Sequence, residues 1–196
     1  MRARDEQKEL AIKEKAIEMI VKDGFDGLSM HKLAKAAGVS PATIYIYYKD
    51  KEDLILQLSI EEWEKMGDAT LKDFDAEMHF DEGLKVQWLN RANYCIENPI
   101  NMHFLEQIRH SPYHDKIKSP DSVFVKTMGR FVKNAIDRKE LIELPLAVYW
   151  SVAFAPMYQL VKFHMSPKKA LGLKKFELTE EILQQTIELV LKALRP

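Results

Sequence analysis

The chain has 196 residues, of which 46% are hydrophobic and 30% are charged, in proportions that are ordinary for a globular protein. Its formal net charge is −1, so the composition as a whole does not indicate a nucleic-acid partner. The chain has a single cysteine, Cys95, which excludes an intrachain disulfide, and no apolar signal segment is visible near the first residues. Both observations lead us to expect a cytoplasmic protein.

Charge is distributed unevenly along the chain. Residues 29–51 contain four lysines and one acidic residue, a local charge of +3, whereas residues 52–196 contain 19 basic and 22 acidic residues. Any contact with DNA is therefore expected near residues 29–51.

Apolar residues recur at helical spacing, and no β-type alternation persists. The first apolar stripe, Ile12–Val21, predicts a helix that stops at Gly24. Ser29 is expected to cap a second, short helix that ends at Gly38. Ser40 is expected to cap a third helix, with Pro41 at its first position, where the missing N–H costs nothing.

The remainder of the chain is also predicted to be helical. Asp50 is expected to cap a fourth helix that runs to about Phe74. Ser119-Pro120 is expected to open a later helix, and the basic stretch 166–177 is expected to form a loop. The further helices are expected near residues 81–98, 99–110, 119–139, 145–163 and 179–194, which gives about nine helices in total.

The run Leu146–Val161 is nearly apolar but is too short to span a bilayer, so a buried helix is the better interpretation and no membrane partner is expected. We therefore predict an all-α fold. An N-terminal domain of three helices, residues 1–50, is expected to precede a larger helical domain, residues 51–196.

The segment from Ser29 to Leu54 carries the chemistry. Two short helices meet across Gly38-Val39-Ser40, which has the length of a helix-turn-helix turn. If Ile44 faces the core, steps of 100° per residue place Tyr48 on the same side. Ala42, Thr43 and Ile46 then point away from the core, and Tyr45 and Tyr47 lie on the two flanks.

This segment resembles the TetR family of bacterial regulators. The resemblance covers roughly the first 60 residues, and only the all-helical architecture is similar beyond them. The matching residues are Gly24-Phe25, Leu33-Ala34, Gly38-Val39-Ser40, Thr43, Tyr45, Tyr47-Tyr48, Lys51 and Leu54.

The resemblance implies a homodimer that binds a palindromic operator in double-stranded DNA, usually as a repressor released by a small molecule. It implies that Thr43, Tyr45 and Tyr47 face DNA and that Tyr48 occupies a core position where the family usually has phenylalanine. Ile46 departs from the polar or aromatic residue often found at its position. From the residues themselves, Lys51 is placed to reach a phosphate, and the backbone after the caps is placed to receive phosphate oxygens. The predicted DNA-binding set is Ser29, Ser40, Ala42, Thr43, Tyr45, Ile46, Tyr47 and Lys51.

The helical body contains many large apolar side chains, and each of them, taken alone, is better explained by a packed core than by a ligand pocket. The resemblance implies that some subset lines a cavity for a small, mostly apolar effector. The candidates are Trp63, Met66, Trp88, Phe104, Phe131, Trp150, Phe154 and Tyr158.

Two other function classes stay open. One is a DNA-binding protein of the same architecture without a small-molecule inducer, and the other is an enzyme, although no GxGxxG, P-loop, GxSxG or HExxH motif is found. His103, His110 and His114 are read as surface histidines rather than metal ligands, and Cys95 as a small buried apolar residue. No catalytic residue, metal or cofactor is expected.

Overall fold

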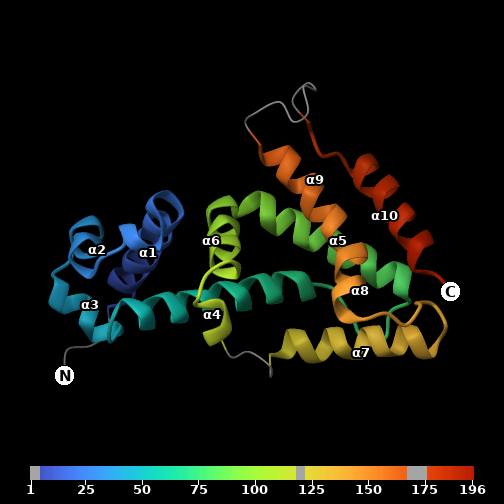
Figure 1. The fold of residues 1–196 in the computed structure, drawn as a ribbon, viewed down its shortest axis with the longest axis horizontal. Helices are drawn as coiled ribbons and strands as arrows, with labels where there is room; N and C mark the ends of the chain where they lie inside the picture. The colour runs from blue at the N-terminus through green and yellow to red at the C-terminus, as the bar shows by residue number, and fades with distance from the viewer. Residues whose placement is uncertain (1–4, 118–121, 167–175) are drawn as a thin grey trace. The chain divides into compact units, whose positions relative to one another are not determined.

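The computed structural model describes residues 5–117, 122–166 and 176–196, and every regular element within these ranges is helical. These ranges hold ten α-helices and one short 3-10 helix, where the sequence predicts about nine helices (Figure 1). The extra helix arises because the predicted helix 145–163 is two helices, α8 (Leu146–Ala153) and α9 (Ala155–Met165). Pro156 in the first turn of α9 has no backbone N–H to continue the hydrogen-bond ladder of α8. The predicted all-α class is confirmed.

The helices form two compact units, and each is described by itself. The first comprises Met1–Lys65 and Asn98–Ser119, and the second comprises Met66–Glu97 and Pro120–Pro196. Helix α4 (Lys51–Leu71) contributes residues to both units. The first unit is thus larger than the predicted helix-turn-helix domain, and the functional boundary at residue 50 stays a prediction.

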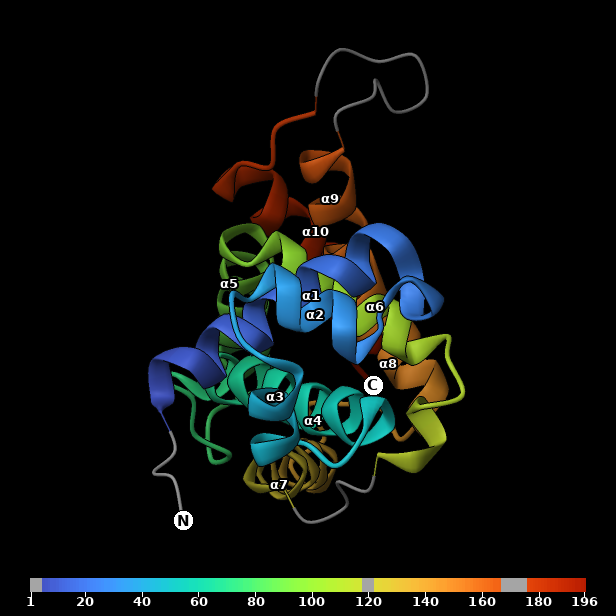
Figure 2. The same ribbon diagram turned by 90° about the vertical axis from the view of Figure 1, so that its left-hand side faces the viewer.

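In the first unit, α1 is the central helix and contacts α2, α3 and α6. The side chain of Gln107 donates to the carbonyl of Val21 across 3.2 Å, and Lys13 pairs with Glu61 of α4 at 2.7 Å. Figures 1 and 2 show α1, α2 and α3 side by side. The helices of this unit are α1 (Glu6–Gly27), α2 (Met30–Ala36), α3 (Pro41–Tyr47), the first part of α4, α6 (Pro99–Arg109) and the 3-10 helix His114–Lys116.

Helix α1 leaves helical geometry where the sequence predicts its stop. Gly24 has φ of 71°, in the left-handed region that favours glycine, and one further turn follows it before the helix ends at Gly27. At the other end, the Asp5 side chain accepts the Lys8 N–H and caps the helix.

In the second unit, α5 contacts both α7 and α9, and α10 contacts α8 and α9. Ser122 caps α7 by accepting the Val125 N–H, and Thr179 caps α10 by accepting the Ile182 N–H. The predicted start of α7 at Ser119-Pro120, and residues 167–175 of the predicted basic loop, lie outside the described residues. The other helices of this unit are α5 (Phe80–Glu97), α7 (Val123–Asp137) and α10 (Glu180–Leu194).

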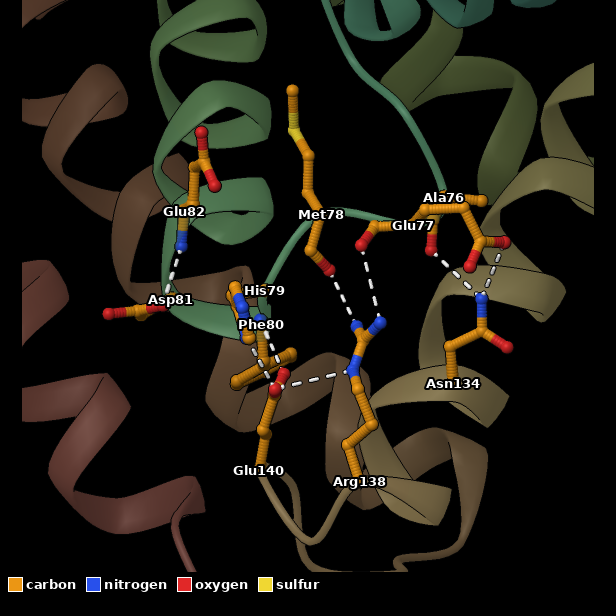
Figure 3. A network of polar contacts seen from close by, with 10 residues as sticks. All are labelled: Ala76, Glu77, Met78, His79, Phe80, Asp81, Glu82, Asn134, Arg138 and Glu140. Atoms are coloured by element: carbon orange, nitrogen blue, oxygen red, sulfur yellow. Dashed lines mark hydrogen bonds and ion pairs between the residues drawn. The ribbon is translucent and has the colours of Figure 1, made fainter.

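A polar network fixes the start of α5 to the end of α7 (Figure 3). Glu140 accepts the Phe80 N–H at 2.8 Å and contacts His79 Nδ1 at 2.6 Å. Arg138 donates to the carbonyls of Glu77 and Met78 and pairs with Glu140 at 3.2 Å. Desolvation acts to raise the pKa of Glu140, but the Phe80 N–H, His79 and Arg138 outweigh it and hold that pKa below its ordinary value. The network therefore pairs the Phe80 N–H, which the start of α5 leaves without a helical partner, and two carbonyls of the segment that precedes the helix.

Helices α5 and α7 also approach closely at Gly83. A Cβ atom at this position would lie 2.5 Å from Cε2 of Phe131, a side chain that is itself fully buried. Only glycine leaves room for this ring.

None of the helices in the described residues combines the length and the apolar character that a membrane span requires.

Candidate nucleic-acid interface

The predicted helix-turn-helix is present as α2, a short turn and α3. Gly38 in the turn has φ of 67°, the conformation for which glycine is expected. Ser29 accepts the Lys32 N–H and Ser40 accepts the Thr43 N–H, each at 3.2 Å, so both serines are the helix caps that the sequence predicts.

One side of α3 is anchored in the core of the first unit. Ile44 is completely buried and Tyr48, which follows the last residue of the helix, is 2% exposed. Both positions agree with the helical spacing, and the core assignment of Tyr48 is confirmed.

The opposite side of α3 is open. Tyr45 is 53% exposed and Ile46 is 45% exposed, although such large side chains are normally placed inside a monomeric domain. Ala42 is exposed, and Thr43 is half-buried with its hydroxyl 2.9 Å from that of Ser40. Because the helix is held from behind by Ile44 and Tyr48, these four side chains stand on a rigid support.

Tyr47 departs from the expected orientation. Its side chain is only 8% exposed, and its hydroxyl accepts the Asp5 N–H at 2.9 Å and donates to the Asp5 carbonyl at 3.0 Å. The tyrosine thus ties the end of α3 to the start of α1, a long-range partner that helical spacing alone does not reveal. The prediction that the Tyr47 ring faces outward is therefore wrong. A DNA contact by this residue stays a prediction.

Lys51 begins α4, as predicted. Asp50 caps this helix by accepting the Asp53 N–H at 2.9 Å, while the Asp53 carboxylate accepts the Lys49 N–H at 2.9 Å. The Gln57 amide and this N–H lower the pKa of Asp53. The cap keeps the backbone rigid at Lys51, whose side chain is partly exposed.

The lysines that gave this segment its positive charge lie at the surface. Lys32 and Lys35 on α2 and Lys49 before α4 are exposed. None of these three lysines forms an ion pair with a described residue, and neither does Lys51. Their positive charges are therefore not neutralised inside the protein.

The structure divides the eight residues proposed to line a ligand cavity. Two of them, Trp63 and Phe104, belong to the first unit, and six belong to the second. Whether any of them contacts a ligand stays a prediction. The six are Met66, Trp88, Phe131, Trp150, Phe154 and Tyr158.

The titratable residues singled out in the sequence are placed as expected. His103, His110 and His114 are all exposed, and Cys95 is buried, which raises the pKa of its thiol to about 11. No group of three or more His, Cys, Asp or Glu side chains suited to a metal ion is found among the described residues.

Sequence reasoning missed two buried polar residues of α5. Gln87 is completely buried and Arg91 is 1% exposed. Their spacing of four residues was the available signal, because it places both on one face of a helix. On a helix of mixed composition such as α5, that spacing alone does not separate a buried polar pair from a solvated one.

Comparisons with known proteins agree on one family. The profile of the family described as "Bacterial regulatory proteins, tetR family" matches residues 12–58, which contain α2, the turn and α3. An HTH-type transcriptional regulator of Haemophilus influenzae is 34% identical over 94 residues, which cover 48% of this chain. The matched region spans 50% of that relative's own length.

Solved structures extend the similarity to the whole chain. A TetR-family transcription regulator from Marinobacter aquaeolei is 28% identical, with a TM-score of 0.75 and coverage of 100% of this chain and 99% of its own. A TetR-family transcriptional regulator from Haemophilus influenzae is 26% identical, with a TM-score of 0.77 and coverage of 98% and 100%. With the helix-turn-helix geometry and the matched profile, these similarities show that the chain belongs to the TetR family of bacterial regulatory proteins.

Proposed function

We propose that this protein is a DNA-binding transcriptional regulator that reads its operator with α3. The observation that carries the proposal is the exposed face of α3, where Tyr45 and Ile46 stand outward on a helix held from behind by Ile44 and Tyr48. A short helix that presents small, hydroxyl and aromatic groups on one side fits a major groove.

The proposed contacts fall into two kinds. Ala42, Thr43, Tyr45 and Ile46 lie on the exposed face and contact base edges, where apolar groups meet thymine methyls and hydroxyls donate or accept hydrogen bonds. A second set contacts phosphates and positions the protein without reading sequence. It consists of Lys51 and the backbone at the caps Ser29 and Ser40. Tyr47 acts indirectly in this proposal, because its hydroxyl is bonded to Asp5 and holds the end of α3 in place.

We further propose that the protein acts as a homodimer on a palindromic operator. Leu146 and Val148 of α8 and Leu189 of α10 are 77%, 45% and 65% exposed in the single chain. Apolar side chains exposed together on two contacting helices are typical of an interface. Ile187, Val190 and Leu194 of α10 pack inside their own chain and are therefore not part of this proposed interface.

The regulator is proposed to be a repressor that a small, mostly apolar effector releases from DNA. Support comes from the second unit, where the large side chains of Trp88 on α5, Phe131 on α7 and Phe154 between α8 and α9 are all buried. A ligand lowers DNA affinity a hundredfold if it favours the non-binding state by about 2.7 kcal/mol. A regulator without an inducer is the alternative, and it predicts no change of DNA affinity with any small molecule.

Equilibrium binding to a mixed-sequence DNA duplex at several salt concentrations tests the electrostatic part of this proposal. Lys51→Ala is expected to weaken binding and to reduce the slope of log K against log salt by about one, because one phosphate contact is lost. Lys85→Ala is the matched control, since Lys85 is an exposed lysine of α5 outside the helix-turn-helix. An unchanged slope in Lys51→Ala, or equal losses in both variants, contradicts the assigned phosphate contact.

A further inference from the structure

Helix α5 carries a buried polar pair that the helix-turn-helix does not explain. Gln87 and Arg91 lie one turn apart on one face, and neither side chain is more than 1% exposed. Arginine stays protonated in proteins, so this face carries a positive charge inside the second unit.

Aromatic rings, rather than a carboxylate, surround this charge. The guanidinium carbon of Arg91 lies 4.7 Å from the ring centroid of Phe154 and 5.3 Å from those of Trp150 and Phe124. One terminal nitrogen, Nη1, donates to the Tyr158 hydroxyl at 3.0 Å. No acidic side chain among the described residues pairs with Arg91. Ring faces stabilise a desolvated cation but leave its remaining N–H donors unused.

The unused donors lie together on one edge. Arg91 Nε and Nη2 have no hydrogen-bond partner among the described residues, and these two nitrogens form the side-on edge of the guanidinium plane. Two parallel N–H donors on one edge match the two oxygens of a carboxylate. Both amide atoms of Gln87 are also without a partner. Buried polar groups are rarely left unpaired in native proteins, so three unpaired donor groups on one helix face indicate an absent acceptor.

Two buried ionisable side chains that feel the charge of Arg91, Cys95 and Tyr149, do not supply the missing anion. Burial raises the pKa of Cys95 to about 11 and raises the pKa of Tyr149 further, although both groups feel the charge of Arg91. Thiol and phenol are therefore neutral at neutral pH, and the charge on Arg91 has no internal counter-ion in the described part of the second unit.

We propose that this face of α5 binds a small organic monocarboxylic acid with an apolar body. Its carboxylate accepts both N–H donors of the Arg91 edge, and the Gln87 amide donates to one of the same oxygens. The rings of Trp150 and Phe154 pack against the body of the ligand. A monoanion balances the single charge, whereas a phosphate dianion has more charge and more oxygens than these groups satisfy.

This inference sharpens the effector of the proposed function and rests on that function only for the consequence at the operator. Arg91 contacts side chains of α7, α8 and α9, so an acid bound to it alters the contacts of three helices with α5. Figure 1 shows α5 beside α9 in the second unit, in agreement with their contact. Ligand binding itself is measured without DNA, so its failure and the failure of DNA binding are distinguishable.

The test compares acids with their alcohols on the full-length protein. The probes are 4-phenylbutyrate and octanoate, each matched with 4-phenylbutan-1-ol or octan-1-ol, and the readouts are calorimetric Kd and thermal melting temperature. At least one acid is expected to bind ten times or more tightly than its alcohol. Arg91→Met is expected to abolish this preference while leaving alcohol binding within a factor of about three. Arg130→Met is the matched control, because Arg130 of α7 is exposed and pairs with Glu77.

Two further variants keep the test decisive if Arg91→Met does not fold by circular dichroism. Arg91→Lys keeps the charge but lacks the two-donor edge, so it is expected to lose most of the acid preference. Gln87→Leu is expected to weaken acid binding about threefold or more. Equal affinity for acid and alcohol, an acid preference that persists in the Arg91 variants, or no binding of any of the four probes overturns the proposal.

Discussion

At the scale of single residues, Tyr47 shows how one hydroxyl positions the reading helix. Its two hydrogen bonds to Asp5 join the end of α3 to the start of α1. Tyr47→Phe keeps the ring and removes both bonds, so we expect a loss of about 1 kcal/mol in the free energy of unfolding, measured in urea. Tyr45→Phe is the control, because the ring of Tyr45 is exposed. The free energy of unfolding of this variant is expected to differ from that of the parent by no more than about 0.5 kcal/mol.

A second residue-scale prediction concerns Glu140 and pH. The pKa of its carboxyl is lowered in the folded protein, so the charged form stabilises the fold above the ordinary carboxyl range. This contribution is lost as pH falls through the folded pKa. Glu140→Gln is expected to cost about 0.5–1 kcal/mol at pH 7, with allowance for partial exposure, and this cost is expected to shrink as the pH falls below the ordinary carboxyl range.

The control for this measurement is Glu143→Gln, because Glu143 is exposed and shares none of the contacts of Glu140. Unfolding free energies of both variants are compared with the parent between pH 3 and pH 7. A difference for Glu140→Gln that stays constant across this range contradicts an ionic role for the carboxylate.

At the scale of elements, close packing decides the effect of glycine substitutions. In Gly83→Ala the new Cβ meets two atoms of Phe131 at 2.5 and 2.6 Å. We expect a net loss of about 1–3 kcal/mol in stability, although alanine is the better helix former by about 1 kcal/mol.

Gly129→Ala on α7 is the matched substitution, and its expected effect on stability has the opposite sign. Nothing lies within 4 Å of its added Cβ, and the glycine is exposed within a helix. It is expected to stabilise the protein by up to about 1 kcal/mol. Thermal or urea unfolding of the two variants checks both signs, and a neutral Gly83→Ala would show that Phe131 moves at little cost.

The helices that local signals define were predictable, and the features that depend on distant partners were not. Caps and glycines placed α2, α3 and the start of α4, because Ser29, Ser40 and Gly38 act within a few residues. Pro156 was the available signal for the break between α8 and α9, because proline removes one backbone hydrogen bond from a helix. The burial of Tyr47 and of Arg91 was not predictable, since their partners Asp5 and Tyr158 are 42 and 67 residues away.

At the scale of the whole molecule, the homodimer is tested by sedimentation. At micromolar concentration the parent is expected at about twice the monomer mass of 22.8 kDa. Leu189→Glu places a charge on the exposed face of α10 and is expected to shift the protein towards the monomer. Leu10→Glu is the control, because Leu10 is 55% exposed on α1. A parent that sediments as a monomer contradicts the proposed dimer.

Selection of bound sequences from random double-stranded DNA tests the central claim, that α3 reads a specific operator. The parent is expected to enrich a palindrome with half-sites centred about 34–36 Å apart along the duplex, because a two-fold dimer meets successive major grooves. Tyr45→Ala is expected to change the enriched bases, while Lys51→Ala enriches the same sequence more weakly. A parent that enriches no sequence, or a Tyr45→Ala variant that enriches the parent's sequence with unchanged affinity, contradicts the claim.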